Sequence, residues 1–142
     1  MSYDDNTYYG HVSPQLDELS STLMGDALDM LAEGEELGVL LVMHMRAGEV
    51  ESLRLSDDGA DKLLQAARDK VRGAKGCERY ALVYEGAVEV EDGAFADAII
   101  LEFGEHGCPS FSAYSLFEGK GQGDEFRWTD PAPAGEEEPL LG

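Results

Sequence analysis

Basic residues are scarce in this chain. Ten Lys and Arg stand against thirty Asp and Glu among 142 residues, so the formal net charge at pH 7 is −20. A protein that binds nucleic acid or an anionic membrane must place cations against phosphates. The negative field therefore disfavours direct nucleic-acid binding and binding to an acidic membrane surface, and it favours a partner protein with a basic surface.

The few cations are also unevenly placed. Residues 1–45 contain nine acids and no base, residues 46–80 seven acids and eight bases, and residues 81–142 fourteen acids and two bases, so segment charges of −9, +1 and −12 sum to −20. We expect a negatively charged body with one nearly neutral patch at 62–79. Two copies of the chain could associate through this patch with less repulsion. That stretch holds six of the ten cations: Lys62, Arg68, Lys70, Arg72, Lys75 and Arg79.

Cysteines are few, and long apolar runs are absent. Two cysteines are too few for a disulfide framework, which fits a reducing compartment. No apolar run approaches the ~20 residues that cross a bilayer, and residues 1–10 are acidic and polar where a secretory signal would be basic and then apolar. These absences predict a small, bacterial-type cytoplasmic protein. No Gly-rich phosphate loop or HExxH motif occurs in the sequence, so we expect no cofactor.

Hydrophobic periodicity predicts two helices. Ser13 followed by Pro14 is a helix start, and apolar residues at three- and four-residue spacing continue toward Gly34, which predicts a helix over about 14–33. A second helix is predicted after the possible caps at 56–58, and it ends at Gly73. The strands are predicted as short apolar or alternating runs between turn residues, at 38–45, 49–55, 79–90, 94–103, 110–117 and 125–129.

An Asp-Gly pair at residues 92–93 predicts a two-residue hairpin turn between two of these strands. Paired residues would then have numbers that sum to 185, as 92 + 93 do, and Leu82 would face Phe103. Because side chains alternate along a strand, Leu82 would share an apolar face with Phe103, and Glu85 would share the opposite face with Glu102.

The predicted order is α-β-β-α-β-β-β, an α+β fold in which two helices pack on one face of a five- to six-stranded, mainly antiparallel sheet. A single domain would span residues 13–129, between a flexible acidic arm at 1–12 and a disordered, acidic, Pro-rich tail at 130–142. The element order resembles the profilin-like arrangement of roadblock-type small-GTPase modulators. That resemblance is one of topology only, and it implies no site residues.

Three carboxylates are candidates for catalysis. Glu85 and Glu102 would be diagonal neighbours on one face of the hairpin, and paired carboxylates can serve acid–base or metal chemistry. Asp97 and Glu102 loosely match the carboxylates of metal-dependent nucleases, although Gly104 stands where such motifs usually place a lysine. The alternative is a solvated sheet face, because thirty acids make chance pairs common.

The numbers of Cys77 and Cys108 also sum to 185, so the same register, extended, would set the two cysteines opposite each other. A reversible disulfide would follow, or a metal site with His106 or His44 as third ligand. The spacing matches no zinc pattern, and two reduced, structural cysteines are the alternative.

The charge distribution favours a non-catalytic protein-binding or adaptor module for a basic partner, such as a nucleic-acid mimic or a chaperone-like protein. A metal-dependent hydrolase or nuclease that uses Asp97, Glu85 and Glu102 is the alternative from a different class. A third hypothesis is a housekeeping domain adapted to high salt, which a content of only four lysines and two isoleucines supports.

Overall fold

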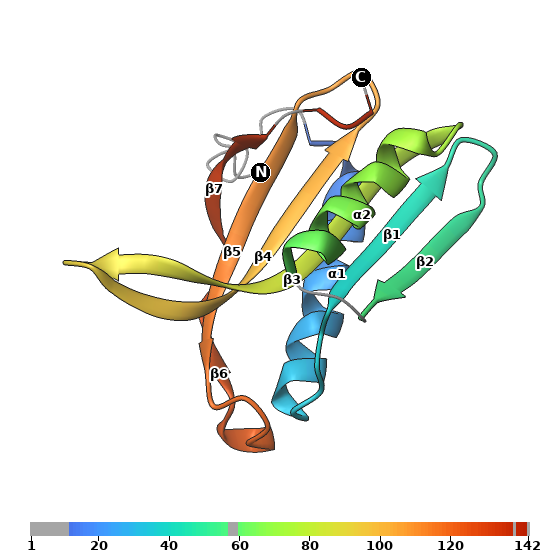
Figure 1. The fold of residues 1–142 in the computed structure, drawn as a ribbon. Helices are drawn as coiled ribbons and strands as arrows, with labels where there is room; N and C mark the ends of the chain where they lie inside the picture. The colour runs from blue at the N-terminus through green and yellow to red at the C-terminus, as the bar shows by residue number, and fades with distance from the viewer. Residues whose placement is uncertain (1–11, 57–59, 138, 142) are drawn as a thin grey trace.

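The computed structural model describes residues 12–56, 60–137 and 139–141, so the predicted arm at 1–12 lies outside the described residues except for its last residue. The chain forms an α+β fold with two helices and a curled antiparallel sheet (Figure 1). Its elements are α1 (Pro14–Ala32), β1 (Val39–Met45), β2 (Val50–Leu55), α2 (Ala60–Gly73), β3 (Cys77–Glu91), β4 (Ala94–Glu105), β5 (Ser110–Glu118), the 3₁₀ turn η2 (Gly123–Glu125), β6 (Arg127–Trp128) and β7 (Ala132–Glu137).

The sheet order is β2-β1-β3-β4-β5-β6, and β7 also pairs with β5. Strands that follow one another in the sequence lie side by side except at two places: β1 pairs with β3 across the α2 connection, and β7 pairs with β5 instead of β6. The central strands are flanked on both edges, whereas β2 forms one end of the sheet. This order confirms the predicted succession of helices and strands and adds β7 to it.

The start of α1 confirms the predicted capping signal. The Ser13 hydroxyl accepts a hydrogen bond from the Leu16 amide at 3.1 Å, and Pro14 occupies the first turn. The helix ends before Gly34, whose φ of 82° is a left-handed conformation that favours glycine. No helix in the described part of the chain is long and apolar enough to cross a membrane.

The two helices cover opposite faces of the sheet, so the prediction of one shared face was wrong (Figure 1). The reason lies in β1, which is apolar on both faces: Leu40 and Val42 pack against the residues under α1, whereas Val39 and Leu41 belong to the cluster under α2. A central strand with two apolar faces needs a cover on each.

Each helix therefore has its own hydrophobic core. The α1 core comprises Leu16, Leu19, Leu23, Met24, Ala27, Leu31, Leu37, Ala81, Val83, Ile99, Leu101, Phe103, Ala113, Phe117 and Phe126, and the α2 core comprises Val39, Leu41, Met43, Ala67, Val71, Cys77, Tyr80, Leu82 and Leu140.

A β-bulge in the β3–β4 hairpin shifts the predicted register by one residue. The turn itself is confirmed, because Asp92 and Gly93 both have positive φ values, 43° and 82°, and Glu91 pairs with Ala94. Val90 has no partner on β4. From Glu89 to the base of the hairpin, the residue numbers of each pair sum to 184 and not to the predicted 185, as in the pair of Glu89 with Phe95. A bulge of this kind inserts one unpaired residue and increases the local twist.

The shift places the two strands' side chains differently from the prediction. Leu82 faces Glu102, and Phe103 faces Ala81. Because a slip of one residue moves a strand's side chains to the opposite face, Leu82 lies in the α2 core and Phe103 in the α1 core. The prediction that Leu82 and Phe103 share a face was wrong.

The C-terminal segment also differs from the prediction of a disordered tail at 130–142. Ala132–Glu137 forms β7, and the Ser112 hydroxyl donates a hydrogen bond to Glu137 at 2.9 Å. Pro133 is accommodated because β7 pairs on one side only, where a missing N–H can face away from the ladder. Farther along, Leu140 is 9% exposed and completes the α2 core.

Candidate functional site

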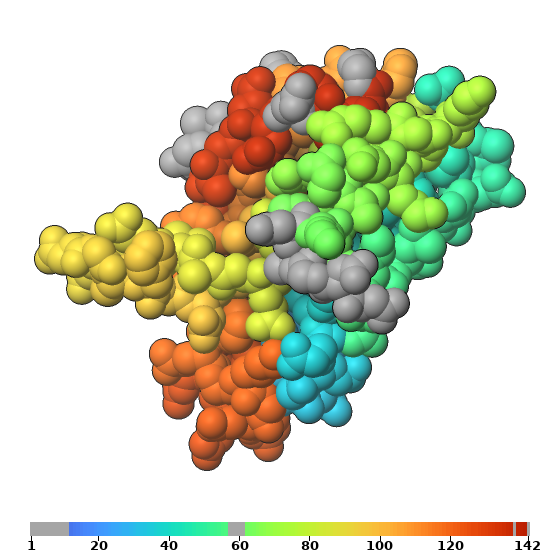
Figure 2. Space-filling view, viewed as in Figure 1, coloured from blue at the N-terminus to red at the C-terminus, as the bar shows by residue number. Residues whose placement is uncertain are grey.

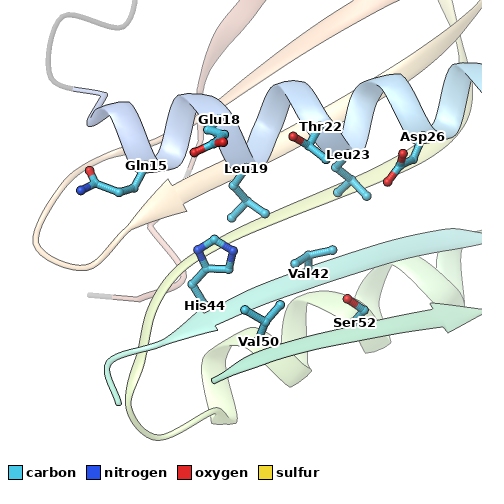
Figure 3. A pocket seen from close by; sticks show the side chains of 10 residues that line it. All are labelled: Gln15, Glu18, Leu19, Thr22, Leu23, Asp26, Val42, His44, Val50 and Ser52. Atoms are coloured by element: carbon cyan, nitrogen blue, oxygen red, sulfur yellow. The ribbon is translucent and has the colours of Figure 1, made fainter. Parts of the chain in front are cut away.

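A groove lies between α1 and the β1–β2 hairpin. It has a volume of about 460 Å³, within the range of ligand-binding clefts. Figure 3 shows α1 along one side and the two strands along the other, with the side chains of both pointing into the space between them. The lining residues are Gln15, Glu18, Leu19, Thr22, Leu23 and Asp26 of α1, Val42 and His44 of β1, and Val50 and Ser52 of β2.

The groove exists because α1 does not cover the whole sheet. α1 contacts β3 and β4 most extensively and β1 less, so it leaves the α1-side face of β2 largely uncovered. The register of the hairpin pairs Val42 with Ser52 and His44 with Val50, which sets all four side chains on that face. Val50 is 58% exposed as a result.

The groove has an apolar floor and an acidic rim. Leu19, Leu23 and Val42 provide the floor, and Glu18 and Asp26 stand exposed on the α1 side. Neither Lys nor Arg occurs among the ten lining residues. The whole of α1 continues this pattern, because the sequence of Pro14–Ala32 contains four acids and no base. Such a surface accepts an apolar side chain next to a cation and repels an anion.

The carboxylate of Glu102 is held in a buried ion pair. Its residue is 4% exposed, and Arg68 of α2 donates to both of its oxygens, at 3.0 and 2.5 Å. The Tyr84 hydroxyl donates a third hydrogen bond at 3.1 Å. Burial, followed by the nearby Glu102 charge, raises the pKa of Tyr84 well above its ordinary value. The cluster is internally satisfied, which is typical of a structural ion pair.

Glu85 lies on the other face of the sheet, where it accepts a hydrogen bond from Lys120 at 3.1 Å. Lys120 also donates to Glu36 at 3.2 Å, so it links the β5–β6 connection to the segment after α1. Glu85 and Glu102 are therefore not neighbours on one face, because the bulge has moved them apart.

Asp97 lies on the outer part of the hairpin, opposite Ala87, and is exposed. It shares a face with Glu85, whereas Glu102 points to the α2 side. The structure thus does not bring the three predicted carboxylates together. The described residues contain no group of three or more His, Cys, Asp or Glu side chains that could hold a metal ion.

The two cysteines are free thiols and are not paired in the sheet. Cys77 is buried and pairs with Met45 of β1, while Cys108 lies in the turn between β4 and β5. Arg79 faces Glu105 in the observed register, and not His106 as the predicted register implied. Burial raises the pKa of the Cys77 thiol to about 11, so this thiol stays protonated and is a poor nucleophile at neutral pH.

His44, the predicted alternative to His106 as third metal ligand, lines the groove and is partly buried. The groove itself was missed because its two sides come from segments about 30 residues apart that only the tertiary arrangement brings together. The one sequence signal that pointed toward it is the absence of bases from residues 14–32. No family model, curated protein or solved structure matches this chain.

Proposed function

We propose that this protein is a non-catalytic binding module whose groove between α1 and the β1–β2 hairpin holds a cationic segment of another protein. The observation that carries the proposal is the combination of an apolar floor with an acidic rim that includes no cation. An apolar side chain of the partner would lie on Leu23 and Val42, with its neighbouring Lys or Arg side chains against Glu18 and Asp26.

The position of the groove at the end of the sheet favours an extended partner segment. β2 is a terminal strand of the sheet order, so one side of its backbone faces no other strand among the described elements. An extended segment can add to such an edge and direct alternate side chains toward the groove. The charges disfavour a nucleic acid, because phosphates would face Glu18 and Asp26.

A defined probe tests this proposal. We would titrate ¹⁵N-labelled protein with a seven-residue peptide of alternating leucine and lysine, and record amide chemical shifts. We expect the shifts to cluster on α1, β1 and β2 and the affinity to fall as salt is added. Shifts spread evenly over the acidic surface, or none at all, would contradict the proposal.

Two matched variants distinguish the effect of charges in the groove from the effect of the net charge of the protein. Asp26→Lys changes a residue that lines the groove, and Asp29→Lys makes the same change three residues farther along α1, outside the lining set. We expect Asp26→Lys to weaken peptide binding about tenfold and Asp29→Lys to weaken it less than about threefold, since contact charges act more strongly than screened ones. Equal losses would mean that the net charge alone attracts the peptide.

A further inference from the structure

The outer part of the β3–β4 hairpin, residues 87–97, is a two-stranded arm without a strand on either side among the described elements. β1 pairs with β3 only as far as Tyr84, and β5 pairs with β4 only from Ala98. Figures 1 and 2 show this arm projecting away from the body of the molecule. A two-stranded ribbon that leaves its sheet gains little stability from the body, so a contact with another molecule would stabilise the arm.

The arm carries two exposed apolar side chains on a well-defined tip. Phe95 is 67% exposed, and Val90, the bulged residue, is 47% exposed. The turn at 92–93 has the mirror-image geometry that matches strand twist, and the Gly93 amide donates to the Glu89 carboxylate at 3.1 Å. The tip is therefore preorganised, which lowers the entropy that a contact would cost.

The arm is also purely acidic. Its residues 87–97 include four acids and no base, which makes its charge −4. On the face of the arm that carries Phe95, Glu89 of β3 is the residue paired with Phe95, and Asp97 follows Phe95 by two residues on β4. The surface that fits the arm is thus an apolar spot surrounded by cations, and two arms placed together would repel each other.

The molecule itself carries a cationic surface on α2 that is complementary to the charge of the arm. Exposed cations cluster on this helix and just after it, and they form what we call the α2 patch: Lys62, Lys70, Arg72 and Lys75.

Lys62 and Lys70 lie eight residues apart, about 12 Å along the helix. Figure 2 shows the arm projecting from the body, which leaves its tip open to contact with a second copy.

We infer that two copies of this chain associate through reciprocal contacts, the arm of each copy on the α2 patch of the other. Such an arrangement is a symmetric dimer with two identical contacts. At an ionic strength of 0.15 M the Debye length is about 8 Å, so the distant acids of the two bodies are screened while the contact pairs between arm and patch are not. The inference is independent of the groove and of the partner proposed for it.

Sedimentation equilibrium in 0.15 M NaCl tests the inference. We expect a concentration-dependent monomer–dimer equilibrium between about 10 µM and 1 mM, and at least a tenfold weaker dimer for Glu91→Lys/Asp97→Lys, since these changes neutralise the arm, from −4 to 0, without touching the Glu89 contact to the turn. A wild-type protein that remains monomeric throughout this range would overturn the inference.

A charge swap makes the test specific. Lys62→Glu/Lys70→Glu should weaken the homodimer like the arm variant does, and an equimolar mixture of the two variants should form a heterodimer. One of its two contacts joins an unchanged arm to an unchanged patch, and in the other the introduced lysines meet the introduced glutamates. Far-UV circular dichroism checks that both variants are folded. Folded variants that form no heterodimer, or a dimer that neither variant weakens, would overturn the assignment of the contact.

Discussion

At the scale of single residues, the role of each carboxylate follows from the cation beside it. Glu102 lies under α2 with the Arg68 guanidinium on both oxygens, whereas the more exposed Glu85 shares Lys120 with Glu36. The same residue type therefore makes a buried structural pair in one place and a partly solvated surface link in another. Sequence spacing alone treats these glutamates as equivalent, because it contains no information about which helix lies above them.

The difference can be measured as stability. Glu102→Gln removes the buried carboxylate that accepts both hydrogen bonds of the partly exposed Arg68 guanidinium, so we expect a loss of about 2 kcal/mol in the free energy of unfolding. Glu85→Gln should cost less than about 1 kcal/mol, since its ion pair is partly exposed and Lys120 keeps Glu36. Urea denaturation of both variants checks this expectation, and equal losses would contradict it.

At the scale of elements, the C-terminal segment is part of the folded domain. β7 pairs along β5 and is followed by Leu140, which fills the α2 core beside residues of β1 and β3. The proline and glutamate content of this segment is typical of disorder, but edge pairing needs few donors and a single buried leucine adds apolar contact. A short acidic segment can therefore be part of the fold.

Replacement of Leu140 tests whether the segment stabilises the protein. Leu140→Ala should lower the free energy of unfolding by about 2 kcal/mol, because it removes most of a buried side chain from the α2 core. Leu141, which packs only partly against the same core, provides the matched control, and Leu141→Ala should cost less. Thermal unfolding followed by circular dichroism measures both, and no loss in Leu140→Ala would mean that the segment does not contribute to stability.

At the scale of the whole molecule, a net charge of −20 opposes the compact state through self-repulsion. The cations that counter it are concentrated on and near α2, so the repulsion is strongest among the acids of α1, the β3–β4 arm and the C-terminal third. This arrangement produces a polarised molecule, which is the property that both proposed contacts use.

Salt should relieve that repulsion and then have little further effect. We expect the unfolding temperature to rise between 10 mM and about 0.5 M NaCl, as the Debye length shortens from about 30 Å to a few ångströms, and to level off near 1 M. Measurement of the unfolding temperature at increasing salt concentrations tests this prediction. A steep rise that continues from 1 to 3 M KCl would instead favour the hypothesis of adaptation to high salt.

By itself, the sequence determined the local features of this protein. The cap at Ser13, the left-handed Gly34, the two-residue turn at 92–93 and the succession of helices and strands all follow from interactions within a few residues, and the structure confirms them. The charge imbalance is also a property of composition alone.

The tertiary structure alone decided what depends on contacts between distant segments. The bulge at Val90 placed Leu82 on the opposite face from Phe103, and it placed Glu85 on the opposite face from Glu102. The alternation of side chains along a strand does not reveal a single unpaired residue, so the sequence did not predict this bulge. The placement of the helices on opposite faces opened the groove beside β2 and left the α2 patch on the surface. These features arise because the central strands are apolar on both faces and pack against a helix on each. This packing depends on contacts between segments that are far apart in the sequence.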